Sequence, residues 1–168
     1  MEKIFSPWRS RYIAGFKNEQ PKSGESLFTK ILAEHKDEKN LVLLRKKYCF
    51  VMMNLYPYNS GHLMVVPYKQ TSTFSGLSSK AYIEIMETTA VMMDVLQKVI
   101  SPHGFNFGAN VGRVAGAGID DHIHFHIVPR WNGDTNFMPT IGDVKVVSED
   151  MRDSFKKIRK QLKKEGLL

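Results

Sequence analysis

The sequence predicts an α+β domain: about five antiparallel strands, one long helix covering one face of the sheet, and short helices near both ends. Two patterns support this class. Several short apolar runs are bounded by turn residues, and one long segment repeats its apolar residues every three or four positions. Size is the third observation, because 168 residues, 42% of them apolar, suffice for one substantial core. We therefore expect one domain over residues 1–168, with an extension at 1–22.

A short helix is expected first, over residues 24–35 (GESLFTKILAEH). Either Ser23 or Ser26 can cap it, because a serine hydroxyl accepts a hydrogen bond from a backbone N–H of the first turn. Its apolar residues share one helical face, formed by Leu27, Ile31 and Leu32.

Three strands follow this helix. The runs LVLLR at 41–45 and YCFVMMN at 48–54 are too short for helices, and the basic turn Lys46-Lys47 joins them as a hairpin. The segment YPYNSG contains turn residues, after which HLMVVPY at 62–68 resumes as a third strand. Successive strands with short connections indicate an antiparallel meander.

The second half of the chain contains the longest helix, expected over 78–100, and two more strands, at 104–111 and 122–130. A loop with three glycines, GRVAGAGIDD, joins these strands. Pro129 should end the last strand or place it at an edge. An amphipathic helix is expected at about 148–166, with an apolar face of Met151, Phe155, Ile158 and Leu162.

The charge of the chain favours anionic partners. It carries 24 Lys and Arg against 17 Asp and Glu, a formal net charge of +7. Much of this excess lies in the C-terminal helix, which we interpret as a packing helix with a solvated face. Nucleic-acid binding by this helix is an alternative, but no nucleic-acid motif supports it.

The sequence indicates a cytoplasmic protein that does not enter a membrane. It contains no apolar run long enough to span one, and the opening MEKIFSPWRSRYIAG lacks the apolar core of a secretory signal. The single cysteine, Cys49, stands in an apolar run and is expected to be a small buried side chain rather than a reactive thiol.

The strand expected at 122–130 carries three histidines at alternate positions, His122, His124 and His126. Side chains of a strand alternate between its faces, so the three imidazoles should project to one side. The residues between them should project into the core; these are Ile123, Phe125 and Ile127. One face of the strand is therefore expected to carry the reactive imidazoles and the other to be apolar.

A metal site is one interpretation of this cluster. Zinc needs nitrogen ligands at about 2.0–2.1 Å, whereas the outer histidines of an extended strand lie roughly 13 Å apart. His122 and His126 should therefore not share one ion, although two of the three could bind one together with a distant ligand such as His62. This alternative stays open.

A nucleophilic imidazole requires fewer assumptions. A neutral ring can attack phosphorus in line, displace a leaving group and pass the nucleotidyl group to a second acceptor, without metal or cofactor. The attacking nitrogen must be unprotonated, which is secured when the other ring nitrogen donates to a carbonyl or a second histidine. Flanking histidines can donate to phosphate oxygens and protonate the leaving group.

The run HIHFHIVPRW resembles the His-φ-His-φ-His-φ-φ signature of the histidine triad (HIT) family, in which φ is an apolar residue. The stretch PRWNGDTNFMP and the opening SPWRSRYI are similar to the branch that contains bacterial diadenosine polyphosphate phosphorylases. The resemblance extends over most of the chain. It implies a HIT-like fold, a homodimer, and catalysis that needs no cofactor.

The resemblance also implies the roles of individual residues. The central histidine of the family carries a covalent nucleotidyl intermediate, and here it is His124. By the same resemblance His122 and His126 contact the phosphate and the leaving group, His62 helps to orient the nucleophile, and Asn54 binds a ribose hydroxyl.

The glycine-rich loop before the triad corresponds to the family's phosphate-contacting loop, because glycines allow backbone amides to approach an anion. The nucleotide-binding residues expected here are Asn110, Gly116 and Gly118. Arg130, after the triad, is expected on the side of the leaving nucleotide. A flexible hairpin connection explains the loop equally well. Arg113, within the loop, can assist a polyphosphate, and a solvated arginine explains it equally well.

One feature departs from the family pattern. Many relatives carry a Cys-x-x-Cys near the N-terminus that contributes to a structural zinc site, and Ser26-Leu27-Phe28-Thr29 stands in that place. Neither hydroxyl replaces a thiolate in tetrahedral zinc coordination. We predict no structural zinc.

The expected function is nucleotidyl transfer: cleavage of diadenosine tetraphosphate or a similar dinucleoside polyphosphate, with phosphate as the acceptor. Water as the acceptor, in a hydrolase of dinucleotides or nucleoside phosphoramidates, is the main alternative. Two alternatives belong to other classes, a metal-dependent hydrolase and a non-catalytic nucleotide-binding protein. The sequence does not separate phosphorolysis from hydrolysis, because both use the same nucleophile.

Overall fold

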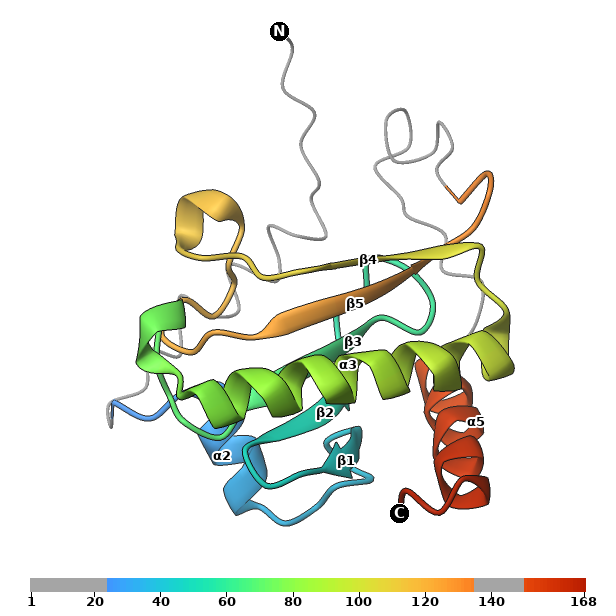
Figure 1. Ribbon diagram of the computed structural model, residues 1–168, viewed down its shortest axis with the longest axis horizontal. Helices are drawn as coiled ribbons and strands as arrows, with labels where there is room; N and C mark the ends of the chain where they lie inside the picture. Colours follow the sequence, from blue (N-terminus) through green and yellow to red (C-terminus); the bar gives the residue numbers. More distant parts are fainter. Residues whose placement is uncertain (1–23, 135–149) are drawn as a thin grey trace, which may run out of the picture.

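The computed structural model describes residues 24–134 and 150–168 (Figure 1). The expected extension at 1–22 and the candidate cap Ser23 lie outside the described residues. Three α-helices are described: α2 (Leu27–Ala33), α3 (Ser79–Ile100) and α5 (Met151–Lys164). Five strands form one sheet: β1 (Val42–Arg45), β2 (Cys49–Met53), β3 (Leu63–Pro67), β4 (Gly104–Gly108) and β5 (Phe125–Arg130). Two short 3₁₀ turns complete these elements: η1 (Phe74–Gly76) and η2 (Arg113–Ala115).

The sheet has the order β1-β2-β3-β5-β4, and every neighbouring pair is antiparallel. The α+β class, the five strands and the meander of the first three are confirmed. In the middle of the sheet, His126 of β5 stands opposite Met64 of β3 and Gly108 of β4. The register therefore places the last histidine of the triad between two neighbouring strands.

Both faces of the sheet are covered. Helices α3 and α5 pack on one face, where their apolar side chains join Ile123, Phe125 and Ile127 in the larger core (Figure 1). Helix α2 contributes Phe28 to a second core on the other face, formed with residues of β1, β2 and β3. The expectation that only one face is covered was wrong. Every residue of β2 and β3 is buried, and such continuous apolar runs are typical of strands covered on both sides.

The last two strands are shorter than expected. Strand β5 begins at Phe125, so His122 and His124 precede it, and β4 ends at Gly108 rather than at residue 111. The backbone N–H of Ile123 donates to the Thr71 carbonyl at 2.7 Å, outside the strand pairing. The alternation nevertheless holds: Ile123 joins the larger core, while the His122 and His124 rings contact Phe28 on the other face.

Serine hydroxyls cap the first turns of two helices. Ser26 caps α2 by accepting from the Thr29 N–H at 3.2 Å, and Ser78 caps α3 by accepting from the Ala81 N–H at 3.2 Å. Cys49 is fully buried in β2, and burial raises the pKa of its thiol to about 12, as expected of a small core side chain. No described helix combines the length and the apolar character that crossing a membrane requires.

Candidate active site

His124, the central histidine, is held by the backbone of the segment that carries it. Its Nδ1 lies 2.9 Å from the carbonyl oxygen of His122. A carbonyl only accepts, so Nδ1 carries the proton and Nε2 is left with its lone pair. Burial lowers the pKa of this imidazole, which favours the neutral ring at pH 7. The geometry therefore provides an unprotonated imidazole nitrogen, which a nucleophile needs.

His122 is fully buried and engaged at both ring nitrogens. Its Nε2 donates to the Pro67 carbonyl at 2.8 Å, and its Nδ1 lies 2.6 Å from the hydroxyl of Ser26. Burial lowers its pKa as well. In this arrangement both nitrogens are directed at protein groups. The predicted contact of His122 with phosphate would require one of these hydrogen bonds to break.

His126 and His62 form a relay that starts at the backbone. The N–H of Tyr58 donates to His62 Nδ1 at 3.0 Å, so a neutral His62 carries its proton on Nε2. That nitrogen lies 2.9 Å from His126 Nδ1, to which it donates. His126 in turn carries its proton on Nε2. The relay therefore fixes the tautomer of a ring whose centroid lies 4.9 Å from that of His124.

Asn54 lies beside the same relay. Its Nδ2 is 3.4 Å from His62 Nδ1, and its Oδ1 accepts from the Tyr56 N–H at 2.9 Å. The side chain is half-buried. Its predicted contact with a ribose hydroxyl stays a prediction, since the amide oxygen already stabilises the turn after β2.

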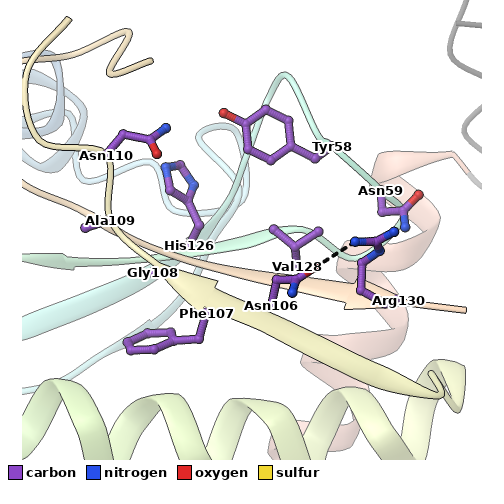
Figure 2. Close-up of a pocket in the computed structure, with 10 residues that line it drawn as sticks. All are labelled: Tyr58, Asn59, Asn106, Phe107, Gly108, Ala109, Asn110, His126, Val128 and Arg130. Carbon is purple, nitrogen blue, oxygen red and sulfur yellow. Dashed lines mark hydrogen bonds between the residues drawn. The ribbon is translucent and has the colours of Figure 1, made fainter. Parts of the chain in front are cut away.

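A cavity of about 460 Å³ opens on the His126 side of the triad (Figure 2). Figure 2 shows the Asn110 side chain beside the His126 ring, with Tyr58 on the other side of that ring. The Phe107 side chain points away from them, toward α3. His126, Asn110 and Arg130, three of the predicted residues, thus border one space.

Arg130 closes the far end of this cavity and is fixed by its neighbours. Its guanidinium donates to both oxygens of Asp134, at 2.6 and 2.8 Å. It also donates to Asn106 at 2.8 Å (Figure 2). The Asp134 carboxylate raises the pKa of this guanidinium. Asn59 donates to the same carboxylate at 2.7 Å. The charge of Arg130 is therefore held at the rim of the cavity.

The glycine-rich loop lies next to the cavity. Asn110 donates to the Gly116 carbonyl at 3.4 Å, and Gly116 has a φ of +95°, a left-handed conformation that favours glycine. Gly118 lies exposed in the following bend. Arg113 pairs with Asp120 at 2.6 Å across this loop. Phosphate binding by the loop stays a prediction.

The structure brings together four predicted histidines and adds residues that the sequence did not single out for the site. The additions are Ser26 beside His122, Phe28 against two of the rings, Tyr58 at the start of the relay, and Asp134 on Arg130. The predicted helix cap at Ser26 is confirmed, but its contact with a residue 96 positions away leaves no local signal. Within residues 24–134 and 150–168, no three His, Cys, Asp or Glu side chains are arranged to hold a metal ion.

Comparison with known proteins finds similar sequences and similar structures. The HIT domain family model matches residues 35–133. The AP-4-A phosphorylase of Mycobacterium tuberculosis is 40% identical over 158 residues, covering 92% of this chain and 80% of that protein. A Zn-bound histidine triad family protein from Mycobacterium smegmatis has a similar structure, with a TM-score of 0.69 and 19% identity over 84% of this chain and 96% of that one.

Proposed function

The chain belongs to the histidine triad (HIT) family, and we propose that it cleaves diadenosine tetraphosphate or a similar dinucleoside polyphosphate by phosphorolysis. The reaction passes through a nucleotidyl intermediate on His124. One observation carries the proposal: the 2.9 Å hydrogen bond from His124 Nδ1 to the His122 carbonyl leaves Nε2 with its lone pair. The similar M. tuberculosis protein, an AP-4-A phosphorylase, supports the choice of substrate and of acceptor.

The first step forms the covalent intermediate. Nε2 of His124 attacks the α-phosphorus of one adenylate, and the bond from that phosphorus to its bridging oxygen breaks. The bond pair leaves with the bridging oxygen, so that ATP departs and AMP stays on the histidine. His126 lies beside the nucleophile and carries its proton on Nε2, which makes it a hydrogen-bond donor to the departing oxygen or to a neighbouring phosphate oxygen as negative charge develops there.

The second step regenerates the imidazole. A phosphate oxygen attacks the same phosphorus, the phosphorus–nitrogen bond breaks, and its electron pair returns to Nε2. The products are ADP and free enzyme, so the sum is diadenosine tetraphosphate plus phosphate giving ATP plus ADP. Arg130 and Asn110, which border the cavity beside His126, are suited to bind the polyphosphate. Water in place of phosphate would give hydrolysis on the same residues.

One experiment distinguishes these outcomes. The protein is incubated with diadenosine tetraphosphate, with and without inorganic phosphate, and the nucleotides are separated by chromatography. ADP that appears together with ATP only when phosphate is present supports the proposal. AMP formed without phosphate would assign hydrolysis instead. A parallel reaction with EDTA tests the metal-dependent alternative, for which activity should vanish and return with zinc.

We further propose that the protein is cytoplasmic, consists of a single domain and works as a homodimer. Among the described residues β4 pairs only with β5, which leaves one edge of the sheet for another strand. A second copy can add its own β4 there, next to the cavity bordered by Asn106 and Gly108. Sedimentation equilibrium would measure the mass, and a monomer at micromolar concentration would contradict this assembly.

A further inference from the structure

We propose that Ser26 is a positioning residue for the nucleophile: its hydroxyl fixes the ring of His122, and thereby the carbonyl that orients His124. The inference rests on the proposed function, because it gives Ser26 a part in the same reaction. Ser26 acts through protein groups and does not need to touch the substrate.

The His122 ring needs a hydrogen-bond donor at one nitrogen. Its Nε2 faces the Pro67 carbonyl at 2.8 Å, and since a carbonyl only accepts, Nε2 carries the proton. In a neutral ring Nδ1 is then an acceptor. The Ser26 hydroxyl, 2.6 Å away, is its donor. Both residues are fully buried, so water does not readily take the place of this hydroxyl.

Ser26 is itself held in place by two further hydrogen bonds. Its oxygen accepts from the Thr29 N–H as the cap of α2, and its backbone N–H donates to the Gln70 side chain at 3.0 Å. The amide of Gln70 also donates to the Gly24 carbonyl at 3.1 Å and to Asp121 at 3.3 Å. One glutamine therefore connects the start of α2 with the residue that precedes His122.

The position of His122 is transmitted to the nucleophile by a short path. The same residue that binds Ser26 through its ring binds His124 Nδ1 through its carbonyl. Phe28, two residues after Ser26, contacts both rings, at centroid distances of 5.3 Å to His122 and 5.2 Å to His124. If the His122 ring moves, the carbonyl moves with it, and the direction of His124 Nε2 changes. A displacement of about 1 Å costs on the order of a hundredfold in rate.

A helix cap alone would also make Ser26 important, so the cap must be separated from the contact with His122. Ser78 offers a matched control, because its hydroxyl caps α3 with the same 3.2 Å geometry that Ser26 uses on α2. Ser78 is exposed, and no hydrogen bond links it to the histidines.

The kinetic test compares Ser26→Ala with Ser78→Ala. We expect Ser26→Ala to lower kcat for diadenosine tetraphosphate phosphorolysis between about tenfold and a hundredfold, with KM changed by less than about twofold. Ser78→Ala should leave both constants at the wild-type values. Equal kcat values in the two variants would overturn the proposal. A loss of kcat confined to Ser26→Ala separates positioning from capping.

A second measurement needs neither the variant nor the substrate. Nitrogen-15 spectra of the histidine side chains report which ring nitrogen is protonated. In the wild-type protein at pH 7 we expect the proton of His122 on Nε2 and that of His124 on Nδ1. A His122 protonated on Nδ1 would have no acceptor for the Ser26 proton and would overturn the proposal. If diadenosine tetraphosphate is not cleaved, the proposed function fails, while these spectra still decide whether Ser26 donates to His122.

Discussion

The two outer histidines of the triad have equivalent places in the sequence, each two residues from His124, but different places in the structure. His122 precedes β5, is fully buried, and donates a hydrogen bond from Nε2 to the Pro67 carbonyl. His126 lies within β5, receives a hydrogen bond from His62, and borders the cavity. Both rings carry the proton on Nε2. What differs is the surroundings of the two rings, so partners distant in sequence determine which outer histidine borders the cavity and which one is enclosed by protein groups.

The largest effect is expected at the residue between them. His124→Asn removes the attacking nitrogen, and we expect turnover of diadenosine tetraphosphate to fall by at least about 10⁴-fold, because loss of a covalent nucleophile abolishes the main pathway. Chromatography of the nucleotides measures turnover, and mass spectrometry of the wild-type protein without phosphate should detect the adenylated histidine. If the variant kept turnover within tenfold of wild type, another residue would be the nucleophile.

The second-largest effect is expected at His126, the outer histidine that borders the cavity. His126→Asn removes the hydrogen-bond donor beside the nucleophile, and we expect kcat to fall between about 10² and 10³-fold, the usual contribution of one donor that stabilises charge in the transition state. The melting temperature should change little, because the ring borders a cavity and the asparagine oxygen can replace Nδ1 as the acceptor of the His62 hydrogen bond. Substrates with a better leaving group need less stabilisation of the departing oxygen, so the loss should shrink for them. An equal loss for all substrates would contradict this role of His126.

The placement of the apolar side chains next to the three histidines was predictable from local sequence. The alternation of His122, Ile123 and His124 predicts which side chains enter the larger core, and the structure confirms it even though β5 starts only at Phe125. The meander followed from the short apolar runs in the same way. The continuous burial of β2 and β3 also had a signal, since neither strand alternates, but the expectation of one covered face overlooked it.

For the histidines, the sequence predicted which residues take part but not their hydrogen-bond partners. The run of histidines and the resemblance to the family named the four histidines. The difference between His122 and His126 depends on Ser26, 96 residues away from His122, and on His62, 64 residues away from His126. Such distances leave no periodicity, and hydrogen-bond direction follows only from the neighbouring carbonyl or N–H group.

Replacement of the fully buried His122 should lower the free energy of unfolding. His122→Asn leaves the Pro67 carbonyl and the Ser26 hydroxyl without the ring between them, and an unsatisfied buried polar group costs about 1–3 kcal/mol. We expect the free energy of unfolding, measured with urea, to fall by about 2 kcal/mol, and by less than about 1 kcal/mol for His126→Asn. A larger loss for His126→Asn would reverse the assignment of the two roles.

The pH dependence sharpens the same contrast. Burial lowers the pKa of His122 and His124 below the ordinary value of 6.5, so the unfolded chain binds protons more readily than the folded one. Their stabilising effect is complete above pH 6.5 and is lost as pH falls toward the folded pKa values, by up to about 1.4 kcal/mol per pH unit for each histidine. Urea titrations at several pH values should show a shallower acid slope for His122→Asn. An unchanged slope would mean that this ring is not buried in its neutral form.

The smallest effect concerns the outer rim of the cavity. Asp134 holds the guanidinium of Arg130 with two hydrogen bonds, and the arginine side chain is 44% exposed, so the ion pair itself contributes little to stability. In Asp134→Asn the charge of Arg130 remains while its direction is no longer fixed. We expect KM for diadenosine tetraphosphate to rise about threefold, the equivalent of one weak hydrogen bond, with kcat unchanged because Arg130 lies away from His124.

Steady-state kinetics measure both constants. The control is Glu84→Gln, because the Glu84 carboxylate on α3 binds the β1–β2 turn away from the cavity. A fall in kcat for Asp134→Asn would mean that the rim orients the reacting phosphate as well as binding it.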